Sequence, residues 1–159
     1  MIQKIKPFLW FDKEAEEAAK FYCSIFKNSK ILEVSRYPEG APAPAGSVMI
    51  VTFQLEGLEF VGLNAGPTFK FTEAISFAVT TENQEETDYY WNKLTADGGK
   101  ESDCGWLKDK FGLSWQITPR ALIELVSSSD KQKSSRVMAA MMTMKKIDIP
   151  TLQRAAAGK

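Results

Sequence analysis

An internal repeat is the feature that most constrains how this chain can fold. Phe8 recurs as Phe77, and the pair Phe21-Tyr22 recurs as Tyr90-Trp91, both at a spacing of 69 residues. A second echo, at a spacing of 55 residues, relates Gly57-Leu58-Glu59-Phe60 to Gly112-Leu113-Ser114-Trp115. A repeat of this length predicts two similar supersecondary modules. Such modules pack their apolar faces together, and the seam between them is a natural place for a pocket.

Composition narrows the class of protein. The chain has 159 residues, enough for one compact body or two small tied modules. Its 20 basic and 20 acidic residues give a net charge of zero. This balance argues against a nucleic-acid-binding protein, because such proteins carry a clustered excess of cations. No apolar run approaches the roughly 20 residues of a membrane span, so we expect no membrane partner. The first residues also lack the apolar segment of a signal peptide.

Two residue types limit the chemistry. The chain has no histidine, which excludes Ser-His and Cys-His nucleophile pairs and zinc sites built on imidazole. Its two cysteines, Cys23 and Cys104, do not make a disulfide framework. The sequence therefore predicts a reduced, cytoplasmic protein that lacks the commonest general base and the commonest metal ligand.

Hydrophobic periodicity predicts the order strand, helix and three strands for each half. In the first half we expect a helix capped by Asp12, and strands at residues 5–11, 31–37, 48–55 and 58–64. In the second half we expect a helix capped by Thr81 and ending near Ala96, and strands at residues 74–80, 102–108 and 113–118. The order calls for one more strand in this half, to which no residues are assigned. The predicted fold class is α+β, with two tandem βαβββ modules at about residues 1–66 and 72–119. Together with a helical tail at 120–159, we treat them as one domain spanning 1–159.

The tail has no counterpart in the repeat. We expect a short helix at 119–126, a second helix capped by Asp130, and a last short helix with Pro150 in its first turn. The second helix ends in a methionine-rich stretch, Met138 to Met144, which could form an adaptable binding surface. Our preferred interpretation is a tail that packs on its own domain or on a partner subunit.

Several motifs resemble those of the PhnB-like family. The first of them is Pro7-Phe8-Leu9-Trp10-Phe11-Asp12 followed by Glu16-Glu17-Ala18-Ala19-Lys20-Phe21-Tyr22. The others are Leu63-Asn64-Ala65-Gly66-Pro67 with Phe69-Lys70-Phe71, Cys104-Gly105-Trp106-Leu107-Lys108-Asp109, Gly112-Leu113-Ser114-Trp115-Gln116, and the tail segments Arg136-Val137-Met138 and Met144-Lys145-Lys146-Ile147-Asp148. The family is often labelled 3-demethylubiquinone-9 3-methyltransferase. It belongs to the vicinal-oxygen-chelate superfamily of glyoxalases, extradiol dioxygenases and bleomycin-resistance proteins.

The resemblance implies a fold and an assembly. Proteins of this superfamily pair two βαβββ modules, and each mixed sheet curls around a cavity. Dimers are common among them, so the resemblance implies a homodimer. A methyltransferase activity does not follow from the residues, because a typical methyl-donor site needs a glycine-rich turn after a parallel strand. Here Gly98-Gly99 ends a predicted helix instead of opening one.

Metal-binding enzymes of the superfamily use His, Gln or Glu side chains on the first and fourth strands of each module. Carried over to this chain, those positions fall at or near Ile5 or Pro7, Val61, Ala74 or Ser76, and Gln116. Only Gln116 has a side chain able to ligate, and a single uncharged amide does not hold a metal ion. We therefore predict no metal and no cofactor.

Strand alternation predicts which side chains face the cavity. If Gln116 faces it, Ser114 does too, while Trp115 and Ile117 face the helices. By the repeat, Leu9 should face the cavity, and Phe8 and Trp10 should face the helix. The predicted ligand-binding residues are Leu9, Val61, Leu63, Asn64, Phe69, Ser76, Trp106, Ser114 and Gln116. For Asn64, Phe69 and Trp106 a purely structural role is an open alternative.

Three functions fit these residues. The first is a metal-free protein that binds an unidentified small, partly apolar molecule, because the predicted cavity is mainly apolar and has no acid–base pair. The second is a divergent lyase, isomerase or dioxygenase-like enzyme that acts without the usual metal site, with Glu59, Asp103 or Asp109 near the cavity. The third is an oligomerisation or regulatory module that acts through the methionine-rich tail. We predict no catalytic residue and rank binding first.

Overall fold

The computed structural model describes residues 3–159. It divides the chain into two compact units, one up to Phe71 and one from Thr72 onward, which are described separately below. No helix among residues 3–159 is both long enough and apolar enough to cross a membrane.

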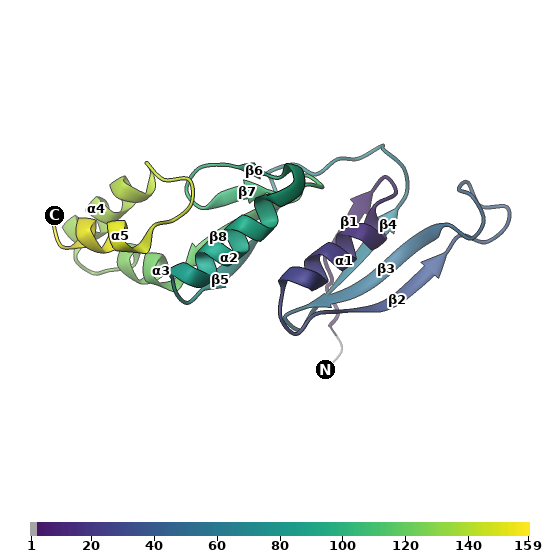
Figure 1. Ribbon diagram of the computed structural model, residues 1–159, viewed down its shortest axis with the longest axis horizontal. Coiled ribbons are helices and arrows are strands. Elements are labelled where there is room, and N and C mark those ends of the chain that lie inside the picture. Colours follow the sequence, from purple (N-terminus) through teal and green to yellow (C-terminus); the bar gives the residue numbers. More distant parts are fainter. Residues whose placement is uncertain (1–2) are drawn as a thin grey trace. The chain divides into compact units, whose positions relative to one another are not determined.

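The first unit is a βαβββ module (Figure 1). Its elements are β1 (Phe8–Phe11), α1 (Ala15–Ile25), β2 (Lys30–Arg36), β3 (Val48–Leu55) and β4 (Leu58–Asn64). The strands form one mixed sheet in the order β1-β4-β3-β2, in which β1 runs parallel to β4 and the other pairs are antiparallel. The helix α1 covers one face of this sheet.

Small side chains bring α1 close to the sheet. The buried face of the helix carries three alanines together with Tyr22 and Ile25. A Cβ atom built on Gly62 of β4 would lie only 3.2 Å from the Cβ of Ala15, so the helix and the strand approach as closely as these residues allow. Tyr22 then stacks near Phe53, with ring centroids 6.1 Å apart, and Phe53 stacks on Phe60 at 5.5 Å. This aromatic layer is the centre of the first core.

The second unit repeats the arrangement and adds three helices. Its elements are β5 (Ser76–Thr81), α2 (Gln84–Thr95), the 3₁₀ turn η1 (Ala96–Gly98), β6 (Lys100–Glu101), β7 (Trp106–Lys108), β8 (Ser114–Pro119), α3 (Arg120–Val126), α4 (Lys131–Met141) and α5 (Ile149–Ala156). The sheet order is β5-β8-β7-β6, with β5 parallel to β8. The predicted fold class, α+β with tandem βαβββ modules and C-terminal helices, is therefore confirmed.

The predicted caps of the two sheet-covering helices are wrong. The helix α1 begins at Ala15, and its first N–H group donates to the Oδ1 of Asn64 on β4, at 2.8 Å, rather than to Asp12. The helix α2 is capped by Asn83, whose Oδ1 accepts from the N–H of Glu86 at 2.9 Å, and not by Thr81. In the tail, the predicted cap Asp130 is confirmed, because its side chain accepts from the first N–H groups of α4.

The tail helices pack on each other and on the second module. Val137, Ile147 and Leu152 are fully buried together with Leu122 of α3. The side chain of Gln84 on α2 then bridges the tail, since its Nε2 donates to the carbonyl of Ile147 at 3.1 Å and its Oε1 accepts from the N–H of Ile149 at 2.8 Å. The tail thus belongs to the core of the second unit, as in the own-domain alternative.

Candidate functional site

Each sheet has a second face that no helix of its own unit covers, which we call the helix-free face. In the first unit, the register pairs Phe8 with Val61 and Trp10 with Leu63 on this face. Leu9 pairs with Gly62, which lies against Ala15 of α1. Leu9 is therefore buried on the helix side, and the predicted orientation of the first strand is wrong.

The reason for this error lies in the connection between strand and helix. Three residues separate the end of β1 at Phe11 from the start of α1 at Ala15, whereas two separate Thr81 from Gln84 in the second unit. The spacing of 69 residues therefore holds for the helices, and the first strands correspond at a spacing of 70. A shift of one residue moves every side chain of a strand to the opposite face.

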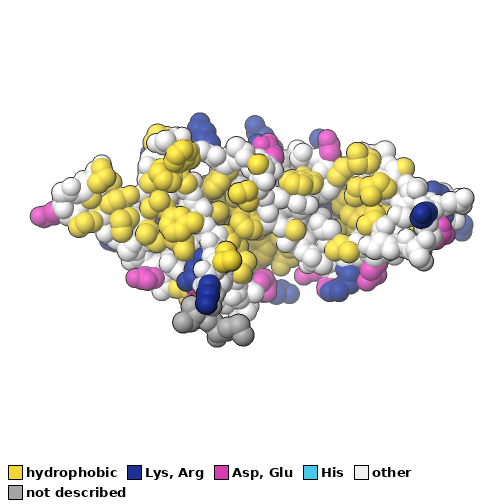
Figure 2. Space-filling view, turned by 180° about the vertical axis from the view of Figure 1, so that it is seen from behind, with side chains coloured by type: hydrophobic (Ala, Val, Ile, Leu, Met, Phe, Trp, Pro, Cys, Tyr) yellow, Lys and Arg dark blue, Asp and Glu magenta, His cyan; other side chains and the backbone are white. Residues whose placement is uncertain are grey.

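The helix-free face of the first unit is apolar around Trp10. The indole packs edge-on against Phe69, with ring centroids 4.8 Å apart, and its Nε1 donates to the carbonyl of Gly66 at 2.8 Å. Phe8 is 59% exposed, and Phe69 is 62% exposed. Figure 2, which shows the molecule from the side opposite to Figure 1, shows hydrophobic side chains gathered on this face. Val61 and Leu63, as register partners of Phe8 and Trp10, belong to the same patch.

Asn64 has a structural role in the first unit. Its side chain is 8% exposed, its Oδ1 holds the first N–H of α1, and its Nδ2 donates to the carbonyl of Val48 at 3.1 Å. Its backbone carbonyl also accepts from the hydroxyl of Tyr37. Asn64 borders a cavity of about 630 Å³ beneath the loop between β2 and β3, but its amide is already engaged within the protein.

The helix-free face of the second unit agrees with the prediction. Ser76, Ser114 and Gln116 share this face, while Trp115 and Ile117 lie on the side covered by α2. The Nε2 of Gln116 donates to the Oγ of Ser76 at 2.8 Å. Strand β7 adds Trp106 opposite Gln116, and Lys108 opposite Ser114. Four predicted site residues, Ser76, Trp106, Ser114 and Gln116, therefore lie on one face.

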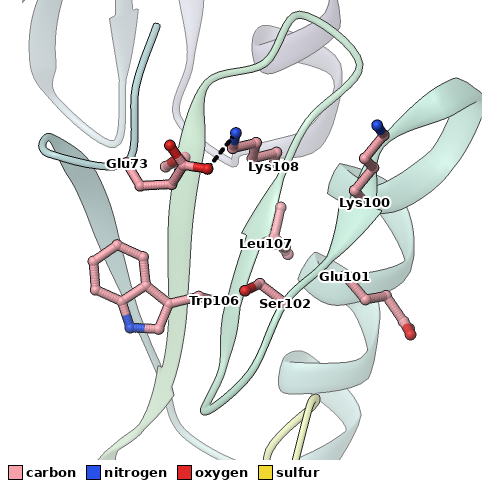
Figure 3. Close-up of a pocket in the computed structure, with 8 residues that line it drawn as sticks. Glu73, Lys100, Glu101, Ser102, Trp106, Leu107 and Lys108 are labelled. Atoms are coloured by element: carbon pink, nitrogen blue, oxygen red, sulfur yellow. Dashed lines mark ion pairs between the residues drawn. The ribbon is translucent and has the colours of Figure 1, made fainter.

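A cavity of about 210 Å³ lies beside this group. Its lining includes Trp106, Lys108 and Ser114, together with Glu73 from the segment before β5 and Lys100 from β6. In Figure 3 the Trp106 and Leu107 side chains leave β7 on opposite sides, and the Lys108 ammonium reaches back to the Glu73 carboxylate in an ion pair. This ammonium lowers the pKa of the Glu73 carboxyl below its ordinary value, mainly through their hydrogen bond.

Ser114 is the unusual member of this lining. Its side chain is 1% exposed, and its Oγ has no hydrogen-bond partner among residues 3–159. A buried hydroxyl without a partner costs about 1–3 kcal/mol. Native structures contain few buried polar groups without a partner, so the Ser114 hydroxyl needs a physical explanation.

The structure adds Lys108 and Glu73 to the predicted residues. Alternation along β7 from Trp106 would have placed Lys108 on the same face as Gln116, so the signal for Lys108 was present in the sequence. Glu73 lies outside any strand or helix, and no pattern in the sequence pairs it with Lys108.

The carboxylates of the enzyme hypothesis have other roles or lie in solvent. The Oδ1 of Asp109 accepts from the N–H groups of Phe111 and Leu113, and its Oδ2 accepts from the indole of Trp115 at 2.9 Å. Glu59 pairs with Lys6, and Asp103 is exposed. Among residues 3–159, no three His, Cys, Asp or Glu residues cluster so that they could hold a metal ion.

Similarity to known proteins fixes the family. The sequence model of the 3-demethylubiquinone-9 3-methyltransferase family matches residues 3–118. The chain belongs to this family. It is 42% identical to the PhnB protein of Bacillus cereus, which carries the same methyltransferase description; the match covers 74% of this chain and 99% of that one, with a TM-score of 0.67. The part of the chain matched by the family model ends before the helical tail, so the resemblance of the tail stays a prediction.

More distant structures share the fold. Protein PA1353 from Pseudomonas aeruginosa is 17% identical, with a TM-score of 0.61 and coverage of 74% of this chain and 98% of that one. The fosfomycin resistance protein FosX from Listeria monocytogenes is 16% identical, with a TM-score of 0.51 and coverage of 75% and 94%. These likenesses show that the chain shares the fold of these two proteins. No curated protein matches the chain.

Proposed function

We propose that this PhnB-like protein binds a small, partly apolar molecule at the helix-free face of its second module, without a metal ion. The observation that carries the proposal is the buried, unpartnered hydroxyl of Ser114 beside the cavity that Trp106 lines. A ligand that accepts a hydrogen bond there would remove the cost of that hydroxyl, and the indole offers an apolar surface next to it.

The size and composition of the cavity support a ligand with a single ring. An engineered cavity of about 150 Å³ holds benzene, so about 210 Å³ leaves room for one ring and a polar substituent. Small-molecule sites combine an apolar surface with a few placed polar groups, and Ser76, Ser114 and Gln116 supply such groups here. We extend the proposal to a cytoplasmic homodimer, because the sequence carries two free cysteines and the superfamily contains many dimers.

We propose binding without a chemical reaction. The carboxylate of Asp109 is occupied by three donors that hold the turn between β7 and β8. The thiol of Cys23 is also a poor nucleophile, because burial raises its pKa.

The test is a fragment screen of the intact chain by two-dimensional ¹H–¹⁵N NMR. We expect bound fragments to shift the indole resonance of Trp106 and the side-chain amide of Gln116, and to be recovered unchanged by mass spectrometry. Trp106→Ala should weaken binding at least about tenfold, since the stacking surface is lost. The matched control is Tyr89→Ala, which removes an exposed aromatic ring from α2. Equal binding by both variants, or conversion of the fragment, would contradict the proposal.

A further inference from the structure

The positions of the lysines beside the second-module cavity favour an anion. Two lysines, Lys100 and Lys108, line it and are cross-strand partners. Of the two acidic residues in the lining, Glu101 accepts a hydrogen bond from the indole of Trp91 on α2, at 2.8 Å. Only Glu73 is paired with a lysine of this lining, Lys108. The lining thus has two lysines and two carboxylates, but Glu101 pairs in register with Leu107 and is turned toward α2, so Glu73 is the carboxylate that faces Lys108.

The ion pair between Glu73 and Lys108 is easily exchanged. Glu73 precedes β5 in a segment without regular structure, and its side chain is 63% exposed. Exposed ion pairs add little to stability, so a competing anion has only a weak contact to displace. Lys108 stands directly across from Ser114 in the register of β7 and β8. Side chains at directly opposed positions have Cβ atoms about 4.5–5.5 Å apart, so one anionic group can contact both.

Resting on the proposed binding function, we propose that the ligand is a small organic anion. In the empty protein, the Glu73 carboxylate occupies the position beside Lys108 that the anionic group of the ligand takes when it binds. The anionic oxygens of the ligand displace the Glu73 carboxylate from Lys108 and accept the hydrogen bond that Ser114 cannot donate within the protein. The apolar part of the ligand lies against Trp106. Carboxylates and phosphonates share this chemistry.

The probes are benzoate, phenylphosphonate and the neutral isostere benzamide, titrated into the intact chain. The readout is the Trp106 indole resonance, assigned with Trp106→Phe. We expect at least one of the two anions to bind with a Kd of about 1–10 mM, and benzamide to bind at least about tenfold more weakly. The anion with the lower Kd identifies the class as carboxylate or phosphonate.

Substitutions test the exchange itself. Glu73→Gln should tighten binding of the anion about two- to fivefold, because the internal competitor is gone. Glu82→Gln is the matched control, since it removes an equally charged, exposed partner of Arg120 away from the cavity. Lys108→Gln and Ser114→Ala should each weaken binding. Circular dichroism spectra of all variants check that they are folded.

Two results overturn the inference and are distinguishable from each other. If benzamide shifts the Trp106 resonance at the same concentrations as benzoate, or if Glu73→Gln leaves the affinity unchanged, the anion inference is wrong while the proposed binding site stands. If none of the three probes moves that resonance at up to about 50 mM, well above the expected Kd, the anion inference is wrong. The proposed function fails as well only if the fragment screen also yields no ligand that moves it.

Discussion

Removing the hydroxyl of Ser114 should make the empty protein more stable. The Oγ is buried and has no partner among residues 3–159, so Ser114→Ala recovers the desolvation cost of that group, about 1–3 kcal/mol. The vacated space is roughly 12 Å³, about one water-sized probe. At about 24 cal/mol per Å³, this small cavity lowers the unfolding free energy by about 0.3 kcal/mol. The expected net gain in unfolding free energy is about 0.7–2.7 kcal/mol.

Urea unfolding followed by circular dichroism measures this gain directly, and thermal unfolding should show a rise of about 2–4 °C for each kcal/mol in a chain of this length. The matched control is Ser134→Ala. The Oγ of Ser134 donates to the carbonyl of Val126 at 2.7 Å, so its removal should cost about 1 kcal/mol. The reasoning is refuted if Ser114→Ala destabilises the protein as Ser134→Ala does, because the Ser114 hydroxyl would then have a partner.

Three further predictions concern the framework. Asn64→Ala should destabilise the first unit by about 2–4 kcal/mol, since two hydrogen bonds of a buried amide are lost. The control Asn92→Ala, at an exposed position of α2, should leave stability nearly unchanged. Equal denaturant midpoints for the two variants would contradict the prediction. Deletion from Asp130 onward should lower the stability of the second unit by more than about 4 kcal/mol, because three fully buried aliphatic side chains leave its core; an unchanged unfolding curve would disprove it. Lys146 lowers the pKa of Asp88, mainly through their hydrogen bond. The contribution of this pair is thus complete above the ordinary pKa of 3.8 and lost as the pH falls below it. Asp88→Asn should therefore lower stability at pH 6 but not at pH 2, and the same deficit at both pH values would exclude the pair as its cause.

Local signals in the sequence were enough for most of the fold. The hairpin of β3 and β4 was predicted at its observed bounds, because Glu56-Gly57 is a pair suited to a tight turn, and both residues have positive φ angles of 46° and 85°. Strand β6 was missed, since two residues are too few for a period to show. The cap of α1 was missed because it comes from Asn64, 49 residues further along the chain.

The candidate site was only partly predictable, and the two modules differ in this respect. In the second module, alternation from Gln116 placed Ser114 and Ser76 correctly on one face. In the first module, one additional residue between β1 and α1 places Leu9, Phe8 and Trp10 on the faces opposite to those predicted. Only the register of the parallel strands reveals this shift. The missing partner of the Ser114 hydroxyl depends on atomic positions, and no residue pattern encodes it.

The most direct test of the account is a high-resolution crystal structure of the protein with whichever of benzoate and phenylphosphonate has the lower Kd. The account predicts anionic oxygens of the ligand within about 2.5–3.0 Å of the Ser114 Oγ and within about 3.2 Å of the Lys108 Nζ, with the ring against Trp106 and Glu73 turned away from the lysine. It is contradicted if the Ser114 hydroxyl donates to a protein atom, or if Glu73 still pairs with Lys108 while the cavity holds no anion.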